Sequence, residues 1–257
     1  MKKQHVLGID IGGTGIKAAV VDIRQGTLLE SPVYVATPQP SNPQAILTAI
    51  RKIIDDLGWE DGVGCGFPGI IVNGRVYLVN NLGSEWEGVD FKQEWKRYIT
   101  NEVSMVNDAD AAALAEMHLG AGRRFNKTGG GVVITLTLGT GIGSGIFVDG
   151  YLMPNTELGL LEFEGNMAEK TVATVVKERE DLSWQGWSSR LNRYLHALET
   201  YFSPNLFIIG GGISESSEKF FPLLTLKTEI RAAQLGNQAG IIGAAFHYSI
   251  QVDPKFG

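Results

Sequence analysis

The sequence predicts a mixed α/β fold made of two lobes, each with a central sheet. Two segments, VLGIDIGGTGIKAAVVD and VVITLTLGTGIGSGIFVDG, place a glycine-rich turn between apolar, β-branched stretches, which is the pattern of a strand, a turn and a second strand. Helical and strand patterns alternate in the rest of the chain, as expected for α/β lobes. With 257 residues, the chain is long enough for two cores of modest size.

The two glycine hairpins also resemble each other in sequence. When residues 13–16 are aligned with residues 139–142, both reading GTGI, Val21-Asp22 falls within one residue of Val148-Asp149. This is weak internal repetition on the scale of half of the chain, which is far longer than the period of a solenoid.

The clearest helix is predicted just after the first hairpin. Ser41-Asn42 is a capping pair, Pro43 suits the first helical turn, and Gly58 ends the pattern. The apolar face of this helix consists of Ile46, Ile50, Ile53, Ile54 and Leu57.

The remaining elements follow in order. Asn73-Gly74 predicts the turn of a hairpin over residues 62–79. Further along we expect a short helix at 91–99, a strand at 103–106, a helix from 109 to near 120, a long amphipathic helix at 187–202, a strand at 205–209 and a last helix at 240–250. We expect a first lobe of residues 1–107 and a second lobe of 108–237, with the last helix, about 238–250, returning to the first lobe.

The composition is that of a globular protein, with 44% hydrophobic and 19% charged residues. The net charge of -6 argues against nucleic acid or an anionic membrane as partner, because both need a broad basic field. Asp10 and the glycines beside it interrupt the first apolar run, so we expect neither a signal segment nor a membrane span there. The single cysteine, Cys65, allows neither an intrachain disulfide nor a thiolate zinc cluster. We expect Cys65 in the core and the protein in the cytoplasm.

The first hairpin, DIGGTGIK at residues 10–17, has the composition of a phosphate-binding turn. Its glycines let backbone amides approach an anion closely, and Thr14 adds a hydroxyl donor. Asp10 is a candidate ligand of Mg²⁺, directly or through water. The other phosphate-binding candidates here are Gly12, Gly13, Gly15 and Lys17. An ordinary glycine turn with a solvated aspartate is the alternative.

The second hairpin, LGTGIGSG at residues 138–145, repeats this chemistry. Thr140 and Ser144 are its hydroxyl candidates, and its glycines are Gly139, Gly141 and Gly143. Neither hairpin fits the Walker pattern or the dinucleotide fingerprint, because a strand and not a helix follows each turn. Two such turns in one chain are more specific than either alone, and together they predict binding of a polyphosphate.

A third glycine run, IIGGGIS at residues 208–214, lies between a strand and a helix expected to start near Ser214. The backbone at Gly211 and Gly212 can pass close to an adenosine or a phosphate chain, with the helix N-terminus favouring negative charge. A simple turn from strand to helix explains the same pattern.

Asn107-Asp108 stands between the strand VSMV and the helix after it. Both residue types are favoured helix caps. A carboxylate fixed at a strand end can also accept the proton of a sugar hydroxyl as that hydroxyl attacks phosphorus. Both interpretations hold if one residue of the pair caps the helix and the other reacts. Asp108 is the candidate general base.

The segment PNTELGLLEFEG supplies polar side chains soon after the second hairpin, namely Asn155, Glu157 and Glu162. Carboxylates and amides commonly bind the hydroxyls of a sugar, although exposed loop acids look the same in sequence. The four histidines lie far apart and are expected to be structural or exposed. Whether the basic residues Arg123, Arg124, Lys127, Lys170 and Lys177 converge on one groove does not follow from their spacing.

Taken together, these segments resemble the ROK family of sugar kinases and regulators, and within it the branch of polyphosphate-dependent glucokinases. The resemblance spans nearly the whole chain. It rests on seven segments in order: DIGGTGIK, GFPGIIVNGRV, VNDADAAALAE, ITLTLGTGIGSGIFVDG, PNTELG, LFIIGGGIS and AGIIGAA.

The resemblance implies an actin-like ATPase fold, related to ribonuclease H, in a homodimer. It also implies magnesium-dependent phosphorylation of glucose at its 6-hydroxyl with ATP, polyphosphate or both as donor. By position, Asp108 matches the family's base, while Asp10, Thr14 and Thr140 match donor-phosphate positions; Asn81, Asn107 and Glu157 fall on or near sugar contacts. The family's cysteine-rich zinc motif is missing, so no zinc is expected. No winged-helix segment precedes residue 10, which disfavours the regulator branch.

One position departs from the family pattern. The family usually reads Glu-Leu-Gly-His, with a histidine that helps to bind the sugar, whereas residues 157–160 read Glu-Leu-Gly-Leu. A lost hydrogen bond to a sugar hydroxyl costs roughly 1 to 3 kcal/mol. Leu160 therefore leaves two alternatives open: a kinase for another sugar, such as mannose, glucosamine or N-acetylmannosamine, and a non-catalytic sugar or nucleotide sensor.

Overall fold

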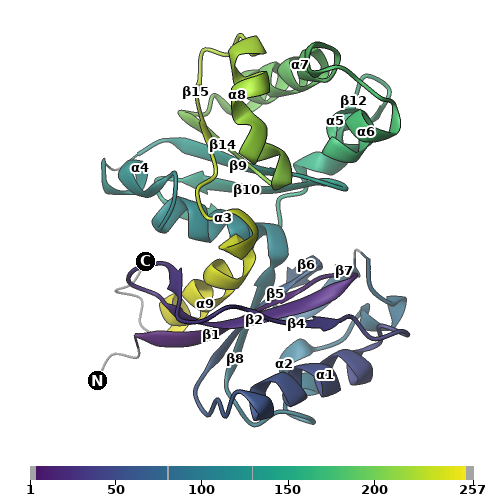
Figure 1. Ribbon diagram of the computed structural model, residues 1–257, viewed down its shortest axis with the longest axis vertical. Coiled ribbons are helices and arrows are strands. Elements are labelled where there is room, and N and C mark those ends of the chain that lie inside the picture. The colour runs from purple at the N-terminus through teal and green to yellow at the C-terminus, as the bar shows by residue number, and fades with distance from the viewer. Residues whose placement is uncertain (1–3, 80, 129, 253–257) are drawn as a thin grey trace. The chain divides into compact units, whose positions relative to one another are not determined.

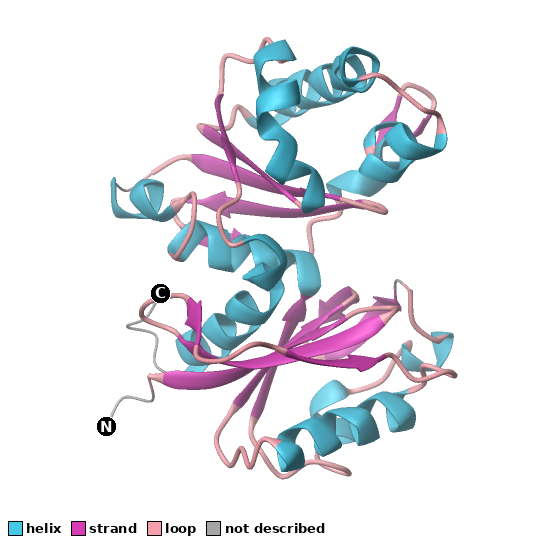
Figure 2. Cartoon of the chain, viewed as in Figure 1, coloured by secondary structure: helices cyan, strands magenta, loops and turns pink. Residues whose placement is uncertain are grey.

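The computed structural model describes residues 4–79, 81–128 and 130–252, without the side chains of 126–128. It divides into two compact units, Met1–Ala115 with Gln238–Gly257 as unit 1 and Glu116–Asn237 as unit 2. Figures 1 and 2 show helices and strands in each unit. None of the described helices is long and apolar enough to cross a membrane.

The sheet of unit 1 has the order β3-β2-β1-β5-β8, and β4 also pairs with β2. Its strands are β1 (His5–Ile11), β2 (Gly15–Asp22), β3 (Thr27–Leu28), β4 (Val33–Ala36), β5 (Val63–Phe67) and β8 (Val103–Asn107). β1 and β2 form an antiparallel hairpin, whereas β1, β5 and β8 run parallel. A separate hairpin, β6 (Gly69–Val72) and β7 (Arg75–Val79), turns at Asn73-Gly74 as predicted.

Helices cover both faces of this sheet (Figure 1). On one face α1 (Pro43–Asp56) buries its predicted apolar side against Leu7, Ile9 and Ile11 of β1, together with α2 (Phe91–Trp95). Asn42 caps α1 by accepting a hydrogen bond from the amide of Ala45. Because side chains alternate along a strand, Gly8 and Asp10 point to the other face. There α9 (Ala239–Val252) packs on β1, β5 and β8.

The contact of α9 with the sheet depends on missing side chains. A Cβ on Gly8 would collide with the Ile241 carbonyl, and one on Gly64 with the Ala244 carbonyl. Gly243 in turn lies directly against the carbonyl of Ala111 in α3 (Asp108–His118). Helix, sheet and α3 therefore approach more closely than side chains at these positions would allow.

The sheet of unit 2 repeats the plan of unit 1, with the order β11-β10-β9-β14-β15. The strands are β9 (Val132–Leu138), β10 (Ile142–Val148), β11 (Tyr151–Met153), β14 (Leu206–Gly210) and β15 (Glu229–Ala232). As in unit 1, the first two strands form an antiparallel hairpin and the next two run parallel to the first. The weak sequence repeat thus corresponds to a repeated sheet topology.

Most helices of unit 2 lie after its hairpin. They are α5 (Ala168–Val172), α6 (Thr174–Arg179), α7 (Trp184–Phe202) and α8 (Ser217–Phe220), with α4 (Arg123–Thr128) before β9. The long helix predicted from its apolar face is α7, which packs Trp187, Leu191 and Leu198 on the sheet. A small hairpin, β12 (Glu162–Phe163) and β13 (Asn166–Met167), precedes α5.

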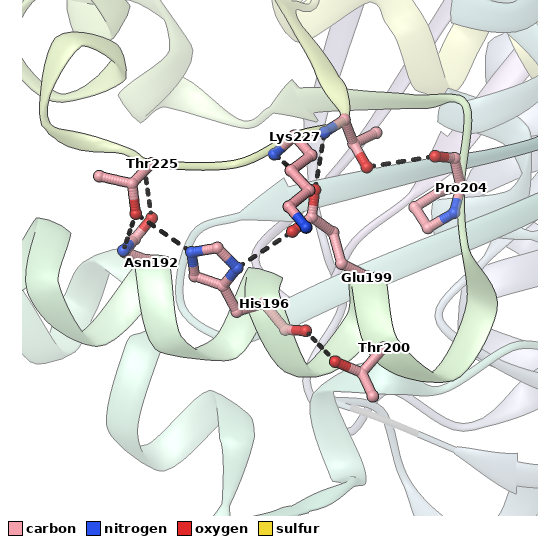
Figure 3. Close-up of polar contacts among 8 residues, drawn as sticks. Asn192, His196, Glu199, Thr200, Pro204, Thr225 and Lys227 are labelled. Atoms are coloured by element: carbon pink, nitrogen blue, oxygen red, sulfur yellow. Dashed lines mark hydrogen bonds and ion pairs between the residues drawn. The ribbon is translucent and has the colours of Figure 1, made fainter.

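Polar side chains of α7 hold the loop that leads into β15 (Figure 3). Asn192 accepts a hydrogen bond from the Thr225 amide at 2.8 Å, and one oxygen of Glu199 accepts from the amides of Lys227 and Thr228. His196 lies 3.0 Å from the other oxygen of Glu199 and 3.1 Å from the Thr225 hydroxyl. His196 therefore has a structural role, as its isolation in the sequence indicated.

The division between the units falls inside α3, after Ala115, whereas the sequence predicts a boundary at the first residue of this helix, Asp108. Ala111 packs against α9 in unit 1. Glu116, in contrast, is buried in unit 2, where its carboxylate accepts hydrogen bonds from the amides of Ala121, Gln234 and Leu235. One continuous helix thus contributes to both units, which strand and helix patterns do not reveal. The segment from Gln238 onward is grouped with unit 1.

Candidate functional site

The first glycine turn, between β1 and β2, is fixed by hydrogen bonds to its carbonyl groups. The Gly12 amide donates to the Gly15 carbonyl at 3.0 Å. Thr37 donates its hydroxyl to the Gly12 carbonyl at 2.5 Å and its amide to the Thr14 carbonyl at 3.1 Å. The Tyr34 hydroxyl also donates to the Thr14 carbonyl, at 3.2 Å. The carbonyls of Gly12, Thr14 and Gly15 are thus occupied, and the Thr14 side chain is exposed.

Asn81 lies against this turn, although it is far away in the sequence. A Cβ on Gly13 would come within 2.8 Å of both the Cβ and the carbonyl oxygen of Asn81. Asn81 itself has a positive φ of 65°, a conformation that asparagine tolerates better than most residues. The structure therefore brings one predicted sugar-binding residue next to the predicted phosphate turn.

Asp10 is the last but one residue of β1 and pairs with Lys17 across the hairpin. Burial raises the pKa of the Asp10 carboxyl, and the charge of Lys17 opposes that rise. The carboxylate also faces α9, where a Cβ on Gly240 would lie 2.9 Å from one of its oxygens. A half-buried carboxylate with a raised pKa is stabilised in its charged form by a nearby cation. Mg²⁺ commonly takes one or two protein carboxylates beside phosphate oxygens and water, so Asp10 fits such a ligand.

Asp108 and Asp10 lie on either side of Gly66 in β5. The position of a Cβ on Gly66 would be 3.6 Å from an Asp10 carboxylate oxygen and 3.7 Å from the Cα of Asp108. Both aspartates stand at the carboxyl ends of parallel strands, β1 and β8, which is where α/β sheets commonly bind ligands. The structure thus brings together two residues that are nearly a hundred positions apart in the chain.

The neighbouring Asn107 acts as the helix cap. Its Oδ1 accepts a hydrogen bond from the Asp110 amide at 3.0 Å, and its Nδ2 donates to the Gly69 carbonyl at 3.1 Å. Asp108 is partly exposed and accepts from the Ala109 amide at 2.8 Å. Of the two roles expected of this pair, Asn107 takes the capping role.

The second glycine turn, between β9 and β10, is held in a similar way. The Gly139 amide donates to the Gly141 carbonyl at 3.0 Å. From the start of α6, the Thr174 hydroxyl donates to the Leu138 carbonyl at 3.2 Å and the Val175 amide to the Gly139 carbonyl at 3.1 Å. Thr140 at the tip is exposed. Both turns therefore have their carbonyls fixed from outside the hairpin and a threonine exposed at the tip.

Two predicted contacts of the second turn belong instead to the strand. Gly143 lies inside β10 opposite Thr137. Ser144 is buried, and its hydroxyl donates to the Thr156 carbonyl at 2.6 Å and accepts from the Leu158 amide at 3.0 Å. The expectation that Ser144 offers a donor to phosphate is therefore wrong, because this hydroxyl fastens the segment after β11 to β10.

The third glycine run adjoins the second turn. Gly211 has a φ of 83°, and a Cβ there would collide with the Leu138 carbonyl, just before the turn. Ser214 donates both its amide and its hydroxyl to the Gly211 carbonyl. Gly212 is exposed at the start of a 3₁₀ turn, Gly212–Ser216, and not of a long helix. The second and third glycine segments therefore form one surface of unit 2.

The predicted sugar-binding segment follows β11. Glu157 precedes a 3₁₀ turn, Leu158–Leu160. The Tyr194 hydroxyl donates a hydrogen bond to the Leu158 carbonyl and so holds this turn. Burial, and then the charge of Glu169, raise the pKa of the Glu157 carboxyl. Leu160 has 41% of its surface exposed, so its side chain is not part of a core. Glu162 is exposed on β12.

Sequence reasoning missed Glu169, Thr37 and Thr174. A Cβ on Gly141 would lie 2.7 Å from a carboxylate oxygen of Glu169, which also pairs with Lys170 at 3.2 Å. Glu169 thus places a negative charge beside the second glycine turn. Nothing in the local sequence of these three residues marks them, since each acts through a tertiary contact. The side chain of Lys127, one of the candidate basic residues, lies outside the described part of the chain.

Comparison with known proteins agrees with this arrangement. Residues 6–157 match the ROK family. The chain is 41% identical over 244 residues to the polyphosphate glucokinase of Mycobacterium tuberculosis, covering 95% of this chain and 91% of that protein. It is 26% identical to the glucokinase of Streptomyces coelicolor, with 93% of this chain and 96% of that protein covered.

Solved structures give the same result. The inorganic polyphosphate/ATP-glucomannokinase from Arthrobacter sp. strain KM matches with a TM-score of 0.88 and 42% identity, over 97% of this chain and all of that one (100%). A ROK family glucokinase from Streptomyces griseus, in complex with glucose and AMPPNP, matches with a TM-score of 0.76 and 26% identity, over 94% of this chain and 98% of that one.

These matches, with the two related sheets and their glycine hairpins, define a kinase of the actin-like ATPase fold. The chain belongs to the ROK family, and it is a sugar kinase.

The charge of Glu169 beside Glu157 can be tested by titration. In Glu169→Gln the pKa of Glu157 should fall, because a repelling negative charge is removed, and should stay above its ordinary value, because burial remains. NMR titration of ¹³C-labelled glutamate carboxyl groups measures this shift. Glu178→Gln on the exposed part of α6 is the control, and a Glu157 pKa that is unchanged in Glu169→Gln would contradict the pairing.

Proposed function

We propose that this kinase phosphorylates a hexose, glucose in the first instance, at its 6-hydroxyl with polyphosphate or ATP as donor. The observation that carries the proposal is the pair Asp10 and Asp108 around Gly66, in a chain 41% identical to polyphosphate glucokinases. The Arthrobacter relative is named for both donors, which supports polyphosphate and ATP alike.

In this proposal Asp108 is the general base. It stands at the start of α3 and is partly exposed, so its carboxylate is accessible to a substrate hydroxyl. A general base that accepts the proton as the hydroxyl attacks phosphorus typically raises the reaction rate roughly 10² to 10⁴-fold. This corresponds to a lowering of the activation free energy by about 3 to 5 kcal/mol. Asn107 positions Asp108 by capping the helix.

Asp10 is the proposed ligand of Mg²⁺, which when bound neutralises the charge that develops on the transferred phosphoryl group. The donor phosphates are bound by the two glycine turns and the third glycine run. In unit 1 the proposed contacts are Gly12, Gly13, Thr14, Gly15 and Lys17; in unit 2 they are Gly139, Thr140, Gly141, Gly211 and Gly212. Fixed turn amides stabilise anionic oxygens without reorganisation during the reaction.

The sugar contacts proposed from unit 1 are Asn81 and Asn107, and those from unit 2 are Glu157 and Glu162, with Leu160 beside Glu157. Leu160 also supports a second candidate substrate. Because its exposed side chain offers no hydrogen bond, a hexose other than glucose, such as mannose, is the alternative acceptor. The Arthrobacter relative is named a glucomannokinase, which supports this alternative. We further propose a homodimer in the cytoplasm, as in the family the sequence resembles.

The direct test is an assay of purified protein with magnesium, glucose or mannose, and ATP or polyphosphate. We expect sugar phosphate from at least one pair, and a fall in kcat of roughly 10² to 10⁴-fold in Asp108→Asn with donor affinity retained. Asp56→Asn, an exposed change at the end of α1, is the control. No product from any pair would refute the proposed reaction, and normal turnover in Asp108→Asn would refute the assigned base.

The role of Leu160 has its own test. Leu160→His adds a hydrogen-bonding group at the position where the family usually has histidine, so kcat/KM for glucose should rise by about tenfold, equivalent to 1.4 kcal/mol. Leu161→His changes the neighbouring exposed leucine and should leave kcat/KM unaltered. An unchanged kcat/KM in Leu160→His would show that this position does not limit sugar recognition.

A further inference from the structure

A fixed aromatic ring lies on the surface of unit 2 where α7 begins. Trp184 stacks on Phe220 of α8 with 6° between the ring planes and 6.2 Å between centroids. Trp187 contacts the Trp184 ring edge to face, with 6.2 Å between centroids. The indole N–H of Trp187 in turn donates a hydrogen bond to the Val172 carbonyl. The ring of Trp184 is therefore positioned by the core, although it is itself only partly buried.

Two lysines place their ammonium groups over this ring. The Nζ of Lys177 lies 4.5 Å from the ring centroid, and that of Lys219 lies 5.5 Å from it. Within the described part of the chain, no carboxylate oxygen lies within 4.0 Å of either Nζ. Nearby cations are paired, since Arg179 and Arg190 both bind Glu180. Lys177 and Lys219 thus place two positive charges over one ring, and among the described residues neither forms an ion pair with a carboxylate.

The lysine pair is continuous with the second and third glycine segments. Lys177 belongs to α6, whose first residues Thr174 and Val175 hold the second glycine turn. It lies three residues after Thr174, a rise of about 4.5 Å along the helix. Lys219 belongs to α8, which directly follows the 3₁₀ turn that begins at Gly212. Two elements that lead away from the glycine segments therefore converge on the same ring.

We propose that Lys177 and Lys219, held by Trp184, bind the distal phosphates of an inorganic polyphosphate chain whose nearer phosphates lie at the second and third glycine segments of unit 2. This rests on the proposed function and extends it to the donor. Lysine is a compact charge suited to phosphate, and a pair of such charges attracts an anion that continues past the third phosphate. A nucleobase is a poorer occupant, because Phe220 stacks on the ring and the ammonium groups lie over it.

The experiment compares two donors in the full-length enzyme. In Lys177→Ala/Lys219→Ala the KM for long-chain polyphosphate should rise about tenfold or more, since two charge-assisted contacts are lost. The KM for ATP should stay close to that of the unchanged enzyme. The rise should shrink at high salt, which screens the lysine charges. Lys177→Arg/Lys219→Arg keeps both charges and should retain most of the affinity for polyphosphate.

Lys227→Ala, which removes an exposed lysine of the same unit, is the matched control and should not alter either KM. An equal rise for ATP and polyphosphate, or no rise for polyphosphate, would overturn the subsite and leave the kinase reaction intact. Absence of activity with both donors in the unchanged enzyme would instead refute the proposed function. A thermal unfolding curve of the double alanine variant, expected to match that of the arginine variant, separates loss of binding from loss of folding.

Discussion

The proposed phosphate site depends on the hydrogen bonds that hold the carbonyl groups of the two glycine turns. A phosphate approaches a turn only if amides face it and carbonyl oxygens do not. In unit 1 the carbonyls of Gly12 and Thr14 are bound by Thr37 and Tyr34, and in unit 2 those of Leu138 and Gly139 are bound by the start of α6. The two turns thus have their carbonyls held by unrelated residues. Both lie at the tip of the hairpin that begins each sheet.

Close packing of helix and sheet also positions the carboxylates of Asp10 and Asp108. β1 and β5 approach α9 through Gly8 and Gly64, and Asp10 then has Gly66 and Gly240 as neighbours. Gly66 lies between Asp10 and Asp108, and a Cβ there would be 3.6 Å from an Asp10 carboxylate oxygen and 3.7 Å from the Asp108 Cα, which are ordinary van der Waals distances. The same packing buries this carboxylate and thereby raises the pKa of Asp10, so a nearby cation would stabilise its charged form.

Much of this arrangement could be predicted from the sequence, because the signals were local. The glycine hairpins, the capped helix α1 and the change from strand to helix at Asn107-Asp108 follow from turn, cap and periodicity rules. Ser144 was misassigned although strand alternation places it on the same side as the buried Ile142 and Ile146. Glu169 and the Lys177–Trp184–Lys219 cluster depend on tertiary contacts between α5, α6, α7 and α8, which no local pattern reports.

The most direct test of this account follows the backbone amides of the two turns by ¹⁵N NMR. On addition of a non-hydrolysable ATP analogue with magnesium, the amide signals of Gly13, Thr14, Thr140 and Gly141 should shift, because their N–H groups acquire phosphate acceptors. Amides in α1, such as that of Thr48, should not shift. If the analogue binds while the signals of both turns stay in place, the turns do not hold the donor and the account is wrong.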